Sequence, residues 1–86
     1  MLRLKVRGIA NHWRYTVVQW MHEIKDILER EYGIELRIEE EDGTSELPEV
    51  YLEDKLILIG VPGEEGYLIE LIKPVIEEYL SRSEAH

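Results

Sequence analysis

The N-terminal stretch alternates strictly between apolar and cationic residues, and this pattern limits what the chain can fold into. Three apolar residues occupy the even positions and three cations the odd ones: Leu2, Leu4 and Val6, then Arg3, Lys5 and Arg7. A period of two is typical of a β-strand, because successive side chains of a strand point to opposite faces of a sheet. We therefore expect a strand with one buried face and one face in water.

A helical stripe follows this strand. Its large apolar residues recur every three or four positions: Trp13, Val17, Trp20, Met21, Ile24, Ile27 and Leu28. Such spacing places side chains on one face of a helix. Asn11 stands where an N-cap is expected, and Gly33 stands where a helix commonly ends. The stripe predicts a core helix between these two residues, with all seven of the large side chains buried.

A second half-buried strand is predicted after the helix. Its apolar and charged positions alternate again, with Ile34, Leu36 and Ile38 on one face and Glu35, Arg37 and Glu39 on the other. A strand, a helix and a strand in this order imply a right-handed parallel crossover. The polar segment from Glu41 to Glu46 (EDGTSE) is predicted to be a loop.

The next segment is predicted to be an antiparallel hairpin. Val50 and Leu52 alternate with polar neighbours, and a turn near residues 53–55 leads into the run Leu56 to Ile59. We expect Ile57 and Ile59 to join Val50 and Leu52 in the core. Leu56 and Leu58 are then expected on the outer face, beside Tyr51.

A second helix closes the predicted fold. After Val61-Pro62-Gly63, the acidic pair Glu64-Glu65 suits a helix N-terminus. The helical stripe consists of Leu68, Ile72, Val75, Ile76 and Tyr79. Pro74 lies inside this pattern, so a kink or a break is expected there. Residues 81–86 are expected to form a C-terminal tail.

The composition excludes several functions. The 86 residues carry 19 acidic and 10 basic side chains, a net charge of −9, which disfavours nucleic acids and anionic membrane surfaces as partners. The absence of cysteine excludes disulfides, thiolate metal sites and dithiol redox chemistry. We expect a cytoplasmic protein, since no apolar run approaches the ~20 residues of a spanning helix and the first residues lack a signal-like apolar centre. A single Asn and a single Gln suit a thermophilic source.

The order of strand, helix, strand, X-Pro, hairpin and helix resembles the thioredoxin-like superfamily. The stretch LPEVYLEDKL, from Leu47 to Leu56, looks like the glutaredoxin segment around its cis-proline. The resemblance implies a two-layer α/β fold, a thioredoxin-like βαββα arrangement with a four-stranded mixed sheet and both helices on one face. It covers residues 1–80 as one domain and implies a cis Leu47–Pro48 bond.

The chain departs from this family where the family performs its chemistry. In place of the Cys-x-x-Cys motif it reads Gly8-Ile9-Ala10-Asn11-His12-Trp13-Arg14, so redox activity does not carry over. Val61-Pro62-Gly63 stands where glutathione-binding relatives place a Ser or Thr with an acidic neighbour. The family's second helix is also missing.

The charge pattern independently favours the family's strand order. If the first strand lies between the second and the third, its cations face acidic residues on both sides: Arg3, Lys5 and Arg7 against Glu35 and Glu39, and against Glu49 and Glu53. Opposite charges on neighbouring strands stabilise a sheet by roughly 0.2–1 kcal/mol per pair. The reverse order would place acidic strands side by side.

Two groups of residues are candidates for binding. The first surrounds the start of the first helix and the proline: Asn11, His12, Trp13, Arg14, Leu47 and Pro48. The alternative is a capped helix start with Trp13 in the core. The second group places apolar side chains on the wet face of a terminal strand, which favours a partner or dimer interface: Tyr51, Leu56 and Leu58. The alternative is that the tail or a loop covers them.

The leading functional hypothesis is a redox-inactive thioredoxin-fold binding module for a protein or peptide, either a separate partner or a second copy. The alternative is a small-ligand-binding protein or non-redox enzyme that uses a cleft between Pro48 and His12, with His12 as acid or base. We predict no catalytic residue under the leading hypothesis, and no cofactor. No metal site is predicted, because His12, His22 and His86 lack the spacing of metal ligands.

Overall fold

The computed structural model describes residues 2–61, 63 and 65–84. Four strands and two helices follow one another along these residues: β1 (Leu2–Gly8), α1 (His12–Tyr32), β2 (Leu36–Asp42), β3 (Glu49–Leu52), β4 (Lys55–Ile59) and α2 (Glu65–Glu84). The element order is therefore βαβββα, and the predicted βαββα is one strand short because the hairpin contributes two strands.

The four strands form one mixed sheet in the order β2-β1-β3-β4. β1 is parallel to β2 and antiparallel to β3, and β3 is antiparallel to β4. The predicted α/β class, with a four-stranded mixed sheet and two helices, is confirmed. β1 lies between β2 and β3, which is the position that its alternating cations predict.

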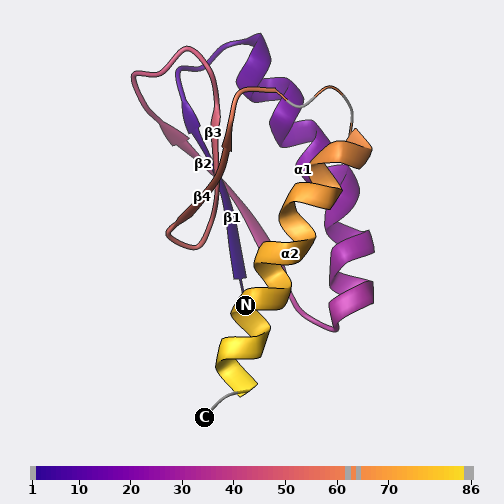
Figure 1. The fold of residues 1–86 in the computed structure, drawn as a ribbon. Helices are drawn as coiled ribbons and strands as arrows, with labels where there is room; N and C mark the ends of the chain where they lie inside the picture. The colour runs from indigo at the N-terminus through magenta and orange to yellow at the C-terminus, as the bar shows by residue number, and fades with distance from the viewer. Residues whose placement is uncertain (1, 62, 64, 85–86) are drawn as a thin grey trace.

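The apolar face of the sheet carries the core. Figure 1 shows α1 and α2 side by side on one side of the sheet. Leu2, Leu4 and Val6 are buried, whereas Arg3 and Arg7 of the same strand are exposed. The core then takes side chains from both helices and from the other strands: Val17, Val18, Met21, Ile24, Leu28, Leu36, Val50, Leu52, Leu68, Ile72 and Ile76. Of the described helices, neither covers the opposite face of the sheet, which we call the open face.

The ends of α1 follow their sequence signals. The side chain of Asn11 caps the first turn, and Gly33 ends the helix in the left-handed conformation at φ 63°. The expected burial of all seven stripe residues is wrong, since Trp13 is 51% exposed and Ile27 is exposed as well. The buried stripe includes Leu28, and Ile27 lies about 100° from it around the helix, beyond the contact with the sheet.

β2 is displaced along the chain from its predicted position. The strand begins at Leu36 instead of Ile34 and continues to Asp42, through residues predicted to form a loop. In the observed register Lys5 lies beside Glu39 and Arg7 beside Glu41, while Arg3 lies beside Arg37 instead of Glu35. The acidic run thus continues the strand because the cations of β1 lie next to it.

α2 passes through Pro74 as one continuous helix, so a break at this position is wrong. Both Pro74 and Glu70, whose carbonyl has no amide partner at position 74, are exposed, and water can take the hydrogen bond that the ring removes. The helix includes Ser81 to Glu84, which were expected in the tail. Pro62, Glu64, Ala85 and His86 lie outside the described residues. Neither helix, over its described residues, combines the length and apolarity of a membrane span.

The C-terminal end of α1 is held to its neighbours by polar contacts. Tyr32 donates a hydrogen bond to Glu77 of α2, and Lys73 pairs with Glu31 at 3.1 Å. The burial of Tyr32 and this bond to Glu77 raise the pKa of the phenol. One flank of α2 is therefore fixed against α1.

Glu29 joins α1 to the start of β2. Its carboxylate accepts hydrogen bonds from the backbone N–H of Leu36 at 2.8 Å and from Lys25 Nζ at 3.1 Å. These bonds, the first above all, hold the pKa of Glu29 below its ordinary value of 4.5. A carboxyl that binds its proton more weakly when folded adds stability above that ordinary value, and the gain is lost as the pH falls through the folded pKa.

We predict that Glu29→Gln lowers the free energy of unfolding at neutral pH and that the difference from the wild type shrinks in acid. Urea unfolding of both proteins at pH 7 and at about pH 3 measures this gap. Glu23→Gln, at an exposed position of the same helix, is the matched control and should leave only a small difference at either pH. A gap of equal size at both pH values would contradict the assigned role of Glu29.

Candidate functional site

Pro48 lies at a tightly packed corner where β1, β3 and the end of β4 meet. Its ring is fully buried, and its carbonyl accepts a hydrogen bond from the N–H of Gly60 at 2.8 Å. A Cβ on Gly8 would stand 3.2 Å from the carbonyl oxygen of Ser45 and 3.4 Å from Cα of Pro48, so only glycine fits there without a shift. The Leu47–Pro48 bond is trans, and the cis bond implied by the family resemblance is wrong for this chain.

Asn11 ties the start of α1 to the loop that precedes β3. Its Oδ1 accepts the N–H of Arg14 at 3.0 Å, and its Nδ2 donates to the carbonyl of Glu46 at 2.9 Å. The N–H of Ile9 donates to the carbonyl of Ser45 in the same region. The structure thus brings the helix start and the proline loop together, as the first candidate group requires.

Arg14 is engaged within the fold. Its side chain is only 13% exposed, and its Nη1 donates to the carbonyl of Gly8 at 2.9 Å and pairs with Asp42 at 2.8 Å. The ends of β1 and β2 are therefore joined to the first turn of α1 by one guanidinium group. A partner would have to compete with these contacts in order to reach it.

The remaining members of the first group lie on the surface. His12 and Trp13 are exposed and meet edge to face, with ring centroids 5.7 Å apart. Leu47 is also exposed. Across the residues that the structure describes, no group of three or more His, Cys, Asp or Glu side chains is placed to hold a metal ion.

A β-bulge changes the second candidate group. Tyr51 pairs with Leu56, but Val50 pairs with Leu58, so Ile57 is an extra residue in β4. Ile57 and Leu58 both pack against the core as a result. The predictions that Leu58 lies on the open face and Ile59 in the core are therefore wrong, and Leu56 and Ile59 are the exposed pair.

The bulge could not be read from the sequence. The run Leu56 to Ile59 contains no polar residue, so no alternation marks which side chain faces the core. Pairing partners define the faces instead. Leu56 continues a row that starts with Lys5 and Tyr51, and Ile59 continues a row that starts with Arg7 and Glu49.

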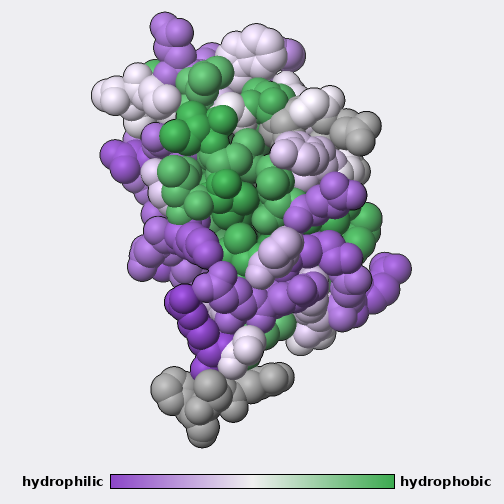
Figure 2. All heavy atoms as spheres, viewed as in Figure 1, coloured by the Kyte–Doolittle hydropathy of each residue, from purple (hydrophilic) through white to green (hydrophobic). Residues whose placement is uncertain are grey.

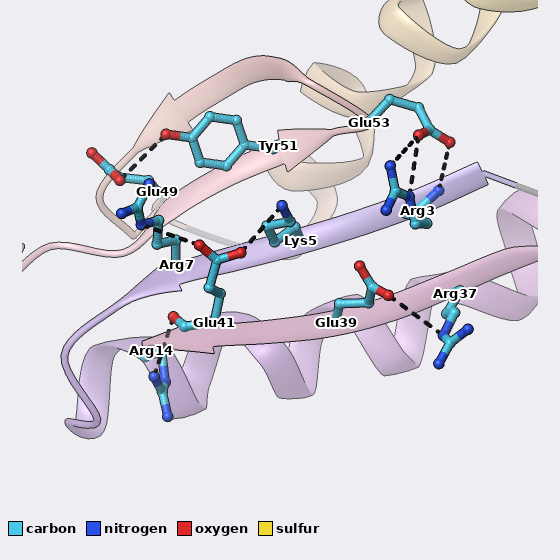
Figure 3. A network of polar contacts seen from close by, with 10 residues as sticks. All are labelled: Arg3, Lys5, Arg7, Arg14, Arg37, Glu39, Glu41, Glu49, Tyr51 and Glu53. Atoms are coloured by element: carbon cyan, nitrogen blue, oxygen red, sulfur yellow. Dashed lines mark hydrogen bonds and ion pairs between the residues drawn. The ribbon is translucent and has the colours of Figure 1, made fainter. Parts of the chain in front are cut away.

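The open face of the sheet is largely neutralised by its own ion pairs (Figure 3). The pairs join neighbouring strands or neighbouring positions of β2: Arg3–Glu53 at 3.2 Å, Lys5–Glu41 at 3.2 Å, Arg7–Glu41 at 3.5 Å and Arg37–Glu39 at 3.6 Å. Tyr51 donates a hydrogen bond to Glu49 at 3.3 Å. The cations of β1 pair with acidic residues on both sides, but through Glu41 of β2 and through Glu53. Glu39 pairs with Arg37 instead, and Glu35, which was expected beside Arg3, lies outside β2.

The apolar surface lies at the β4 edge of the sheet. Figure 2 shows hydrophobic side chains gathered over β4 and the adjoining part of α2. We define the β4 surface by the apolar residues of β4, by Val61 of the connection, and by Val75 with Leu71 one turn before it on the flank of α2 that carries Glu78: Leu56, Ile57, Leu58, Ile59, Val61, Leu71 and Val75. Leu56 is 44% exposed and Ile59 is 54% exposed. β4 is a terminal strand with a neighbour on one side, and such an edge presents unpaired backbone groups.

One flank of α2 belongs to this surface. The ion pair between Lys55 and Glu78, at 3.0 Å, places that flank beside the hairpin, while Lys73 and Glu77 on the other flank contact α1. A cavity of about 390 Å³ opens at the same end, where Leu52, Val75 and Tyr79 line it together with charged residues of the hairpin and the helix: Glu53, Asp54, Lys55, Glu78 and Arg82. The helix and the strand therefore form one continuous edge.

No protein-family model, curated protein or solved structure matches this chain. Its function therefore has to be inferred from the geometry of its own residues.

We predict that Asn11→Ala lowers the free energy of unfolding by about 1 kcal/mol for the lost cap, with a further loss for the bond to Glu46. Asn11→Asp is the matched variant, because its carboxylate keeps the cap acceptor and removes the donor to Glu46. Chemical denaturation should rank the wild type first, Asn11→Asp second and Asn11→Ala last. If the two variants proved equal to the wild type, the double role of Asn11 would be refuted.

Proposed function

We propose that this chain is a redox-inactive, thioredoxin-like binding module that holds a protein partner on the β4 surface. The observation that carries the proposal is a terminal strand with exposed apolar side chains on its open face and partly exposed ones on its helix face. Monomeric proteins usually protect such an edge with charge or cover it. β4 carries a single charged residue, Lys55, at its start.

The family likeness is supported by the arrangement of the strands. β1 is parallel to β2 and antiparallel to β3, and Pro48 stands directly before β3 near the start of α1. The family's redox chemistry requires thiols, and this chain has no cysteine. A scaffold of this kind that lacks the reactive thiols can still function by binding a partner through its surfaces.

The alternative of an enzyme centred on His12 finds less support. The polar neighbours that could assist this histidine are already engaged, since Asn11 bonds to Glu46 and Arg14 to Gly8 and Asp42. Acid–base catalysis needs a second polar group that converges on the same substrate atom. The imidazole ring of His12 packs against the ring of Trp13.

Site-specific photocrosslinking tests the proposal. A photoreactive amino acid is placed at position 56 or 59 of the full chain, which is then expressed in its native host and irradiated. We predict that both positions form a discrete adduct with a protein, because a bound partner excludes water from these side chains.

The control carries the same group in place of Tyr15, which is 60% exposed on α1 and lies away from β4. Adducts at Tyr15 in the same yield as at positions 56 and 59, or no adduct at either of these two positions, would refute the β4 surface as a binding site. The mass of each adduct identifies the partner as another protein or as a second copy.

A further inference from the structure

We infer that the partner of the β4 surface is a second copy of this chain, with the two β4 strands paired antiparallel about a twofold axis between Ile57 and Leu58. This inference rests on the proposed function and names the partner. It joins two sheets of four strands into one sheet of eight, and the same surface serves both copies, as in other twofold interfaces.

Along β4, the faces of the sheet to which successive side chains point follow the same order from either end of the run Leu56 to Ile59. Lys55 points to the helix side, where it meets Glu78, and Leu56 points to the open face. Ile57 and Leu58 both point to the helix side, and Ile59 returns to the open face. From Leu56 to Ile59 the order is thus open, helix, helix, open.

This order fits a second copy. Residues directly opposite each other in an antiparallel pair point to the same face of the sheet. With the axis between Ile57 and Leu58, Leu56 lies opposite Ile59 of the second copy on the open face. Ile57 then lies opposite Leu58 of the second copy on the helix side, so each residue faces one of matching direction.

The bulge also discriminates against other partners. An ordinary extended segment alternates strictly, so opposite Ile57 and Leu58 it would place one side chain on the wrong face. A bulge in an edge strand commonly hinders pairing with regular strands in this way, while the apolar side chains of the edge stay exposed. A second copy carries the same irregularity at the same place and does not meet the mismatch.

The α2 helices of the two copies add to the interface between them. A twofold axis perpendicular to the sheet leaves the helices of both copies on one side, so the Leu71 and Val75 flank of each α2 faces the seam. These side chains would cover Ile57 and Leu58 of the paired strands. The apolar layer would then continue from one copy into the other, and the partly exposed residues of this layer would become buried.

The net charge of the chain opposes this dimer at low ionic strength. Each chain carries a net charge of −9, so two copies repel one another at long range. No residue of β4 itself is acidic, and Lys55 would lie opposite Gly60 of the second copy. Added salt screens the repulsion and leaves the apolar contact, so self-association should strengthen as the ionic strength rises.

Cysteine crosslinking tests the register directly. The chain has no cysteine, so a thiol is present only where one is introduced. An equimolar mixture of Leu56→Cys and Ile59→Cys should give a disulfide-linked heterodimer on mild oxidation, since directly paired strand residues lie within disulfide range. Tyr15→Cys mixed with Ile59→Cys is the control and should remain monomeric on a denaturing gel.

Sedimentation velocity provides the second measurement. The wild type should show a concentration-dependent dimer, and Leu56→Lys should raise the dissociation constant at least about tenfold, while circular dichroism confirms its fold. Tyr15→Lys is the matched control and should behave as the wild type. Leu56 is chosen because it is exposed, whereas Leu58 contributes to the core.

Two results would overturn the inference: a wild type that stays monomeric at millimolar concentration, or crosslinking between positions 56 and 59 no faster than in the control mixture. If either occurred together with photocrosslinks from position 56 to a different protein, the proposed function would stand and the second copy would be excluded as its partner. A crosslinked heterodimer that responds to Leu56→Lys and strengthens with salt supports the inference.

Discussion

The rest of the structure depends on the opposite requirements of the two faces of β1, one of which must be buried and the other exposed to water. Its even positions must be removed from water, and Leu4 and Val6 are fully buried beneath the helices. Its odd positions carry three cations that need acidic neighbours and access to water. Only an inner position in an open-faced sheet meets both demands, because it provides a strand on either side and a helix layer on one face alone. The open face is thus a consequence of three basic residues.

Much of the fold could be predicted because local signals were strong. Asn11 and Gly33 marked the ends of α1. The alternation in β1 marked which of its faces is buried and where the strand lies in the sheet. The predictions failed where a neighbour decided the outcome. β2 extends into an acidic run because cations lie beside it. α2 continues past Pro74, where Glu70 and Pro74 are exposed residues and water can replace the lost hydrogen bond.

The candidate site was predicted less well, for a related reason. Tyr51 and Leu56 were correctly placed on the open face, since this pair lies between the hairpin turn and the bulge, where the register is regular. Ile59 was missed, and Leu58 was misplaced, because a run of four aliphatic residues carries no polar marker of its faces. Leu71 and Val75 belong to the surface only through the position of α2 beside β4, which no helical stripe can reveal. Composition located the apolar strand, but pairing was needed to find its exposed face.

The guanidinium of Arg14 has a consequence for how the molecule moves. Because it bonds to the end of β1 and to Asp42 of β2 from the first turn of α1, these three elements cannot separate there without the loss of several contacts at once. β4, in contrast, is held by one neighbouring strand and a few side chains of α2. The hydrogen-bonded amide protons beside Arg14, such as those of Ile9 and Gly43, should therefore exchange with solvent only when the whole domain opens, whereas those of β4 in a single copy exchange through local opening. The molecule thus combines a rigid corner at Arg14 with a more flexible edge strand, β4.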